Sequence, residues 1–427
     1  MYFTSTAEKA SRKTLSQAIL CGLAEDGGLF VPETFPQLDL HSFSPDTPYP
    51  DFAQQVLKPF FAQDPIEKHL SAFCRNAFNF PLPLKTINQN TFILELFHGP
   101  TLSFKDFGAR FLAEALNSLS IQHKTTVMVA TSGDTGSAVA AAFHLKPQIQ
   151  VIVLYPQGKI SARQEHQITC WGDNVLALAV DGTFDDCQAL VKEAFRDHAW
   201  QKALHLSSAN SINIGRLLPQ VAYYAFTSLL FYKQHQQAAG FIVPTGNLGN
   251  ATAAYWAKAL GFPIREIVLS TNANVVIPDF IKTGHFTPRP SIATLANAMD
   301  VGNPSNFERL HQLYPAFATF QENVSAYSAT DADIRSTIPE MYQQHKVIVC
   351  PHTATACFAR KQLSAQPWII VATADPCKFD DIIEPLLKIN IPVAPQLQAL
   401  LDKPTLQVPV GRNLKDLEQV LQKRGLL

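Results

Sequence analysis

The sequence predicts an α/β protein built on open, mostly parallel β-sheets that helices cover, preceded by a helical N-terminal segment. Two observations lead to this prediction. From about residue 91 onward, short apolar runs of strand character alternate with runs of helical periodicity, and short turns join them. Before that point, residues 1–90 contain helical patterns and many prolines, of which Pro81 and Pro83 mark the boundary.

The first expected element is a short helix within residues 14–23 (TLSQAILCGL). Thr14 and Gln17 have the spacing of a capping box, in which each side chain bonds a backbone N–H that the helix leaves free. The turn of residues 25–28 (EDGG) follows this helix.

A strand over 91–96 (TFILEL) and a helix that begins near Phe104 (FKDFGARFLAEALNSL) are expected next, because apolar residues recur at helical spacing through the second stretch. Ser103 is expected to be the N-cap of this helix. Asp106, three residues later, then completes an acidic variant of the capping box.

The rest of the chain repeats the alternation of strand and helix. Because ligands of such sheets bind outside the carboxyl ends of the strands, the residues that follow each strand are the candidates for function. The expected pairs, strand first, are 125–130 and 136–144, 150–156 and 161–168, 175–180 and 184–195, 240–245 and 251–260, 346–350 and 353–363, and 367–373 and 379–388.

Composition narrows the kind of partner. The chain has 427 residues, of which 34 are basic and 35 acidic, and the net charge of −1 gives no overall field for nucleic acid or an anionic membrane. A small molecule is the expected partner. The seven cysteines are odd in number, scattered and without CxxC spacing, so they suggest neither disulfides nor a zinc site and fit a reducing cytoplasm. No apolar run approaches the ~20 residues that span a bilayer.

Lys105 lies in the first turn of the helix that begins near Phe104, where the positive end of the helix dipole disfavours an ammonium group. If the site is buried, Phe104 and Phe107 also desolvate the amine, and both effects lower the pKa of a lysine. A neutral lysine amine can act as a nucleophile, a base or a Schiff-base partner. The alternative is an ordinary lysine whose amine reaches solvent, with Asp106 nearby.

The turn Gly246-Asn247-Leu248-Gly249-Asn250 follows a strand and leads at once into a helix. Glycines let several backbone N–H groups converge there, and the helix N-terminus adds partial positive charge, so the turn suits a phosphate group. It is neither GxxxxGK[ST] nor GxGxxG, which argues against a nucleotide. An ordinary strand-to-helix turn is the alternative.

A second polar turn, residues 131–136 (TSGDTG), also follows directly on a strand. Ser132, Asp134 and Thr135 offer side-chain and backbone groups at a helix start, which suits a substrate carboxylate. The alternative is a plain turn in which Ser132 or Asp134 caps the helix. Thr373, at the end of a later strand, could direct its hydroxyl into the same crevice.

These features gain meaning in combination. A lysine suited to an imine, a phosphate-binding turn without nucleotide signatures and a carboxylate-binding turn all follow strands of one α/β pattern. Pyridoxal phosphate and an amino-acid substrate require those three attachments. The residues therefore favour an enzyme that uses pyridoxal 5′-phosphate.

The chain also resembles a known family, threonine synthase of the long bacterial and fungal type, one of the fold-type II pyridoxal-phosphate enzymes. The matching stretches span nearly the whole chain in the family's order. They are GLAEDGGLFVP (22–32), HGPTLSFKDFGARF (98–111), TSGDTGSA (131–138), SSANSINIGRLLPQ (207–220), PTGNLGN (244–250), AMDVGNPSNFERL (298–310) and TADPCKF (373–379).

The resemblance implies a role for each candidate residue and a tryptophan synthase β-like fold of two lobes. Lys105 would be the Schiff-base lysine and Thr373 the partner of the pyridine nitrogen. Asp134 would lie near the 3′-oxygen of the cofactor. The remaining implied contacts are the cofactor phosphate with Gly246, Asn247, Leu248, Gly249 and Asn250, the substrate carboxylate with Ser132 and Thr135, and the substrate phosphate with Asn210, Ser211 and Arg216.

Arg216 suits a phosphate because its fork can bind two oxygens at once. The alternative for residues 210–216 is a helix start with a solvated arginine. Two positions depart from the family: Leu248 replaces a usual aromatic residue, and Asp375 replaces a usual histidine. The first matters little if the turn binds through its backbone, whereas a carboxylate from Asp375 near the cofactor could alter ring protonation unless it points away.

The reaction implied by the resemblance is a β,γ-replacement that converts O-phospho-L-homoserine and water to L-threonine and phosphate, the last step of threonine biosynthesis. Two other functions stay open at this point. The chain could be another fold-type II lyase, such as a threonine or serine dehydratase, although residues 210–216 and the long N-terminal segment argue against that. It could also be a catalytically silent relative that binds a phosphorylated metabolite.

The expected domains are an N-terminal segment over 1–90, a lobe over 91–236 with the Schiff-base lysine and the carboxylate loop, and a lobe over 237–427 with the cofactor-phosphate loop and Thr373. In such enzymes the chain can cross between the lobes more than once.

Overall fold

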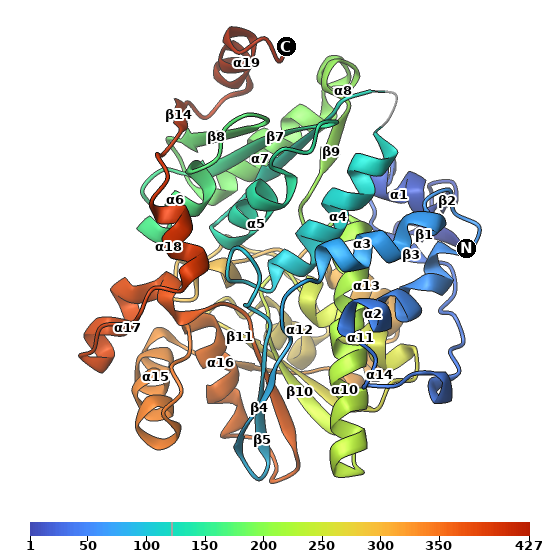
Figure 1. The fold of residues 1–427 in the computed structure, drawn as a ribbon, viewed down its shortest axis with the longest axis vertical. Helices are drawn as coiled ribbons and strands as arrows, with labels where there is room; N and C mark the ends of the chain where they lie inside the picture. The colour runs from blue at the N-terminus through green and yellow to red at the C-terminus, as the bar shows by residue number, and fades with distance from the viewer. Residues whose placement is uncertain (121–122) are drawn as a thin grey trace.

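The computed structural model describes residues 1–120 and 123–427. These residues form two lobes, each built on one β-sheet with helices around it, and an N-terminal segment that lies beside them (Figure 1). The predicted α/β class with open, mostly parallel sheets is confirmed.

The upper lobe of Figure 1 contains a sheet of five parallel strands in the described residues, in the order β14-β8-β7-β6-β9. Its strands are β6 (Thr125–Ala130), β7 (Ile149–Pro156), β8 (Val175–Val180), β9 (Leu206–Ser208) and β14 (Gln407–Val410). Its helices are α4 (Lys105–Leu119), α5 (Asp134–Phe143), α6 (Ala162–Thr169), α7 (Phe184–Arg196), α8 (His198–Leu204), α9 (Ile214–Leu217), α19 (Leu414–Lys423) and the 3₁₀ turn η4 (Leu218–Gln220).

The lower lobe contains a sheet of six strands within the described ranges, in the order β12-β11-β10-β13-β5-β4, parallel except for the edge strand β4. Its strands are β4 (Leu84–Asn88), β5 (Thr91–Glu95), β10 (Ala239–Pro244), β11 (Ile264–Thr271), β12 (Ser325–Ser328) and β13 (Trp368–Ala372). Its helices are α10 (Val221–His235), α11 (Gly249–Ala259), α12 (Val276–Thr283), α13 (Phe307–Leu313), α14 (Phe317–Asn323), α15 (Asp331–His345), α16 (Pro351–Arg360), α17 (Asp380–Leu387) and α18 (Pro395–Leu401), with 3₁₀ turns η5 (Asn297–Met299) and η6 (Pro376–Phe379).

The N-terminal segment adds a small antiparallel sheet to the predicted helices. Helix α1 (Leu15–Cys21) begins after Thr14, and both bonds of the predicted capping box with Gln17 are present. The other elements of the segment are β1 (Tyr2–Ser5), β2 (Lys13–Thr14), β3 (Phe30–Pro32), α2 (Tyr49–Leu57), α3 (Leu70–Ala77) and the 3₁₀ turns η1 (Leu40–Ser42), η2 (Lys58–Phe61) and η3 (Glu67–His69).

Most strands of the two sheets are buried on both faces, which is why they read as continuous apolar runs, whereas β4, β12 and β14 are partly exposed. Along β6, Val127 and Val129 belong to a large central core, whereas Met128 and Ala130 face a second core under α7 and α19. The central core extends through both lobes and the N-terminal segment, so the lobes are joined by shared apolar packing.

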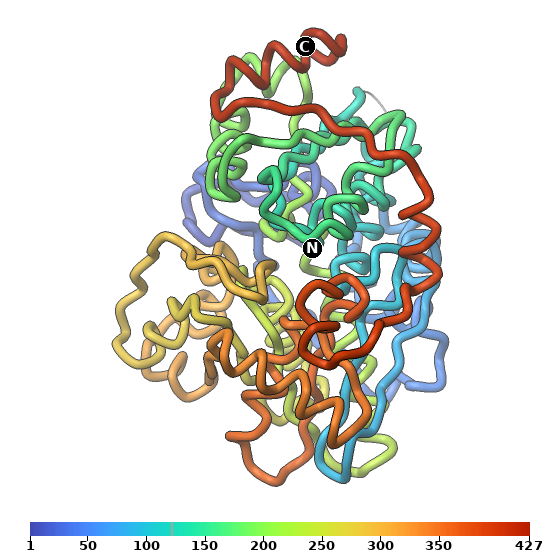
Figure 2. Tube along the Cα trace, turned by 90° about the vertical axis from the view of Figure 1, so that its left-hand side faces the viewer, coloured from blue at the N-terminus to red at the C-terminus, as the bar shows by residue number. Residues whose placement is uncertain are grey.

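Three strands cross the predicted domain limits, and the first is β4, which lies within 1–90 yet pairs with β5 in the lower sheet. Strand β5 lies within 91–236 yet pairs with β13 in the lower sheet, and β14 lies within 237–427 yet pairs with β8 in the upper sheet. Figure 2 shows the C-terminal segment running from the lower lobe up to the upper one. With these three crossings, the division into 1–90, 91–236 and 237–427 stays a proposal for how the chain is organised.

Two local predictions are wrong. Helix α4 has Phe104 as its N-cap with no side-chain bond, because the Asp106 carboxylate instead accepts hydrogen bonds from the N–H and hydroxyl of Thr101. Residues 346–350 form no strand; their apolar run packs into a core instead, where Val349 and Cys350 are buried. They lead directly into α16, with Cys350 as its N-cap.

We expect Gly240→Ala to lower the free energy of unfolding by about 1–3 kcal/mol, measured by denaturant titration. A Cβ at this position would lie 2.4 Å from two ring carbons of the buried Trp368, at the contact between β10 and β13. Gly172→Ala is the control, since its Cβ would meet only a methyl carbon of Leu406, at 3.2 Å. Equal stability of the two variants would contradict the packing argument.

Candidate active site

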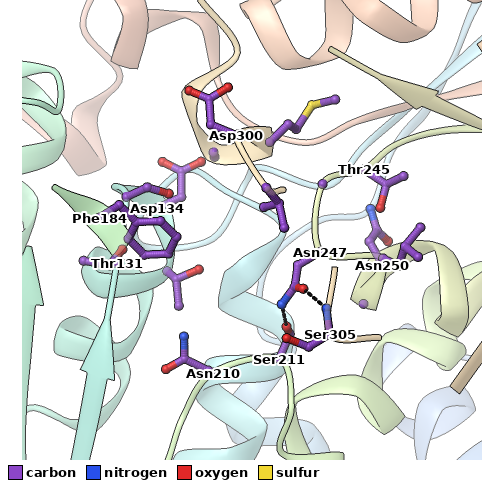
Figure 3. Close-up of a pocket in the computed structure, with 18 of the residues that line it drawn as sticks. Thr131, Asp134, Phe184, Asn210, Ser211, Thr245, Asn247, Asn250, Asp300 and Ser305 are labelled. Carbon is purple, nitrogen blue, oxygen red and sulfur yellow. Dashed lines mark hydrogen bonds between the residues drawn. The ribbon is translucent and has the colours of Figure 1, made fainter. Parts of the chain in front are cut away.

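The candidate residues line one pocket between the two sheets, with a cavity of about 240 Å³. Lys105, Asp134, Asn247 and Thr373 each follow a parallel strand, namely β5, β6, β10 and β13. In Figure 3, Thr131, Asp134 and Phe184 lie on one side of the pocket and Thr245, Asn247 and Asn250 on the other, with Asn210 and Ser211 between them. The remaining predicted residues also line it: Ser132, Thr135, Arg216, Gly246, Leu248 and Gly249.

Lys105 is largely buried, and its side chain keeps only 14% of its surface exposed. Burial lowers the pKa of its amine; the Asp134 carboxylate opposes this, and Lys378 and Arg216 lower the pKa further. The predicted lowering of the Lys105 pKa is therefore confirmed. The sequence suggested the helix dipole as a second cause beside burial, whereas in the structure neighbouring cations have that effect. The amine lies 5.1 Å from the centre of the Phe104 ring.

Asp134 is a buried carboxylate between two lysines. Its Oδ1 lies 2.7 Å from Lys378 Nζ and its Oδ2 lies 3.7 Å from Lys105 Nζ. Burial alone would raise the pKa of Asp134, but Lys378 first and then Lys105 hold it well below its usual range. Gln164 Nε2 also donates to Oδ1, at 2.9 Å.

The glycine–asparagine turn begins α11 and offers free donors. Within the described residues, the backbone N–H groups of 246–250 donate to no protein group. Leu248 adopts a left-handed φ of 61°, which turns the chain into the helix. A Cβ on Gly246 would lie 2.7 Å from the Met299 Cα, so only glycine fits against that backbone. Such a turn can bind a phosphate through its backbone.

Four side chains that line the pocket have a buried polar atom with no hydrogen-bond partner in the part of the chain that the structure describes: Thr373 at Oγ1, Asn250 at Nδ2, Arg216 at Nε and His352 at Nδ1. Buried polar groups are rarely left unpaired, so these atoms suit polar atoms of a bound molecule. The Asn250 Oδ1 is already engaged by the hydroxyls of Tyr223 and Tyr224, which fixes the orientation of the amide.

The turn that begins α5 offers donors on the opposite side of the pocket. Gly133 has a φ of 137° and is the N-cap, which leaves neither Ser132 nor Asp134 as a side-chain cap. The alternative that either residue caps this helix is therefore wrong. The N–H groups of Ser132, Asp134 and Thr135 form no hydrogen bond within residues 1–120 and 123–427. They can donate hydrogen bonds to an anion such as a carboxylate.

Residues 210–216 hold the floor of the pocket. The Asn210 amide donates to Ala130 O at 3.2 Å, and the Ser211 hydroxyl accepts from the Asn247 amide at 2.7 Å, which joins this loop to both sheets. Arg216 is 4% exposed, donates to Ala209 O, and packs against Gly108 one turn beyond Lys105. Because the side chain is buried, the solvated-arginine alternative is wrong; burial also lowers the pKa of Arg216 to about 10.

Sequence reasoning missed three residues of the site. Arg309 is buried and its guanidinium donates to Phe30 O, Ser211 O and Ile212 O, so it holds the 210–216 loop in place. His352 lines the pocket and accepts from Ala298 N–H; burial lowers its pKa to about 4. Lys378 is the third. Arg309 and Lys378 lie in stretches of family resemblance, but only the fold brings them here.

The two departures from the family do not disturb the pocket. Asp375 accepts a hydrogen bond from Cys377 N–H at 2.8 Å and caps η6, so its carboxylate is engaged by its own turn. It is absent from the residues that line the described pocket. Leu248 is fully buried in the central core, and its backbone lines the turn.

Comparison with known proteins decides the family. Residues 79–373 match the family described as pyridoxal-phosphate dependent enzyme, and residues 2–78 match the threonine synthase N terminus. The threonine synthase of Haemophilus influenzae is 41% identical over 413 residues, 96% of this chain and 97% of that protein. The chain belongs to the threonine synthase family.

Solved structures of the family have the same fold. The structure of threonine synthase from Escherichia coli has a TM-score of 0.93 and 35% identity, covering 99% of this chain and 100% of that one. The pyridoxal-phosphate-bound structure from Brucella melitensis has a TM-score of 0.91 and 32% identity, covering 99% of each chain. These likenesses make the fold that of the fold-type II enzymes.

Pyridoxal phosphate is the cofactor of the family, and the residues present fit it. The free N–H groups of 246–250 suit its phosphate, the unpaired Thr373 hydroxyl suits its ring nitrogen, and the Lys105 amine opens into the same pocket. A metal is not needed for these contacts; among the described residues no cluster of three or more His, Cys, Asp or Glu could hold one.

We expect Gly246→Ala to weaken cofactor binding by about tenfold or more, measured as the dissociation constant of pyridoxal phosphate by titration of visible absorption. The added methyl group would press on the Met299 backbone, which cannot move aside as a flexible side chain would. Gly172→Ala again serves as the control. An unchanged dissociation constant in Gly246→Ala would show that the turn does not hold the phosphate.

Proposed function

We propose that this chain converts O-phospho-L-homoserine and water to L-threonine and phosphate, with Lys105 as the catalytic residue. Full-length similarity to threonine synthases supports the reaction. The observation that carries the residue assignment is the buried Lys105 amine, which shares one pocket with the glycine–asparagine turn.

Lys105 would hold the cofactor covalently and, once displaced by the substrate amine, would move protons. When bound, pyridoxal phosphate supplies an electron sink for negative charge at the substrate α-carbon. Burial lowers the pKa of Lys105 and so increases the share of neutral amine at a given pH, which suits removal of the α-proton and then a β-proton. Asp134, beside this amine, would face the 3′-oxygen of the cofactor.

Besides Lys105 and Asp134, two further sets of contacts would hold the cofactor, and two would hold the substrate. Gly246, Asn247, Leu248, Gly249 and Asn250 would bind the cofactor phosphate, and Thr373 would contact the ring nitrogen through a neutral hydroxyl. Ser132 and Thr135 would bind the substrate carboxylate. Asn210, Ser211 and Arg216 would bind the substrate phosphate, where the buried guanidinium is worth more than in water.

We further propose a cytoplasmic location. The support is that all seven cysteines lie in the described residues without forming a disulfide, and six of them are buried. In the described ranges, no helix is both long and apolar enough to cross a membrane. No contact with nucleic acid or membrane is part of the proposal.

We expect Lys105→Ala to abolish both the visible absorption of the bound cofactor and the formation of threonine from O-phosphohomoserine. Without the amine no covalent link to the cofactor forms, and no base stands at the substrate. The assays are absorption spectroscopy, phosphate release and threonine detection, with exposed Lys415→Ala as the control. If Lys105→Ala keeps either property in full, the assignment is wrong; a wild type that makes no threonine would reject the reaction.

We expect Arg216→Met to lower kcat/KM for O-phosphohomoserine by roughly 10- to 100-fold, since a hydrogen bond to a charged group contributes about 1.5–3 kcal/mol. Arg216→Lys keeps the charge but loses the two-pronged geometry of the guanidinium, so its kcat/KM should lie between those of Arg216→Met and the wild type. Cofactor absorption should stay unchanged in both. An Arg216→Met enzyme with the wild-type kcat/KM would place the substrate phosphate elsewhere.

A further inference from the structure

Two buried lysines share the single carboxylate of Asp134. Lys378 Nζ lies 2.7 Å from Oδ1, whereas Lys105 Nζ lies 3.7 Å from Oδ2, which is beyond hydrogen-bond length. Lys378 comes from η6, after β13, and Lys105 comes from α4, after β5. The carboxylate therefore has one close cationic partner, and that partner is not the candidate Schiff-base lysine.

Lys378 cannot itself reach a ligand in the pocket. Its side chain has 0% exposure and is not among the residues that line the described cavity, whereas Lys105 is. Its Nζ also donates to Thr101 O at 2.9 Å, and Thr101 in turn donates its hydroxyl to Asp106. Lys378 is held by bonds on two sides and has no free path to a substrate.

The charges around Lys105 make the position of Lys378 important. Asp134 faces it from α5, Lys378 from η6, Arg216 from α9 and His352 from α16, while Asp106 follows it on its own helix. His352 has a pKa lowered to about 4 and is neutral at ordinary pH. The Asp106 carboxylate accepts hydrogen bonds from the N–H and hydroxyl of Thr101. The state of the Lys105 amine thus depends on which lysine holds Asp134.

We propose that Lys378 is a positioning residue that holds the Asp134 carboxylate at hydrogen-bond distance, so that Lys105 meets this carboxylate only across a longer ion pair and its amine loses its proton more readily. This inference rests on the proposed function, in which Lys105 is the reactive amine. Without Lys378, Asp134 is free to pair with the Lys105 ammonium. A neutral amine is required both to bond the cofactor and to accept a proton.

Lys378 also joins η6 to residue 101 and to α5, so a purely structural role is the competing explanation. The two explanations differ in what they predict for the amine of Lys105. A structural tie would change stability in any variant, whereas the proposal requires a change in protonation whose direction depends on which charge is removed.

The test measures the nucleophilicity of Lys105 in the cofactor-free full chain. Trace acylation with acetic anhydride is run from about pH 6 to about pH 11, a series that brackets the ordinary lysine pKa, and modification of Lys105 is read by peptide mass spectrometry. In Lys378→Met, pairing with Asp134 should shift the titration of Lys105 upward by about one pH unit. At fixed pH below the midpoint, acylation then falls about tenfold.

Two further variants test the direction in which the titration of Lys105 shifts. Lys378→Arg keeps a cation beside Asp134 and should retain the wild-type titration. Asp134→Asn removes the carboxylate, leaves Lys105 near two cations, and should shift its titration downward, opposite to Lys378→Met. Thermal melting checks that each variant is folded; if Lys378→Met is not, the comparison of Asp134→Asn with the wild type still tests whether the carboxylate governs the amine.

The proposal is overturned if Lys378→Met, folded, leaves the Lys105 titration unchanged or shifts it downward, or if Asp134→Asn shifts it upward. In the holoenzyme, the acid limb of the kcat/KM profile should move to higher pH in Lys378→Met and not in Lys378→Arg. A wild type that makes threonine, together with an unmoved titration in Lys378→Met, would reject this inference and leave the proposed function standing.

Discussion

The parallel direction of the strands is the constraint on which this site depends. In the two sheets, β5, β6, β10 and β13 run so that their carboxyl ends meet at one crevice between the lobes. Each strand places its next residues there, and the backbone at those turns is not used up by sheet hydrogen bonds. Turns that lie far apart in the sequence therefore line one pocket.

The second constraint is the placement of buried charge. Burying an ion is costly unless it is paired or hydrogen-bonded, yet Arg216 and Arg309 bind mainly backbone carbonyls. Their positive charge is left to act on the pocket, which suits a cofactor and a substrate that each bring a phosphate. Lys105, by contrast, forms an ion pair with the Asp134 carboxylate, and Lys378 lies closer to that carboxylate.

Much of the fold could be read from the chain, since strands buried on both faces give apolar runs and capped helices give local signals. The capping box at Thr14 and the alternation from 125 onward are of this kind. The strand expected over 346–350 fails because its apolar run packs into a core without pairing, and Ser103 fails as a cap because the Asp106 carboxylate bonds Thr101 instead. Thr101 lies only five positions before Asp106, but spacing alone does not show whether the carboxylate bonds Thr101 or Ser103.

The sequence by itself determined the chemistry at each strand end: the amine of Lys105, the glycine turn and the polar turn at 131–136 are local patterns whose backbone freedom and side chains suffice to suggest their ligands. Only the tertiary structure decided what surrounds that amine. Lys378 lies 273 positions further along the chain, and its approach to Asp134 results from strand pairing in one sheet and lobe packing against the other. Electrostatic effects depend on distance in space, and the order of residues does not contain that distance.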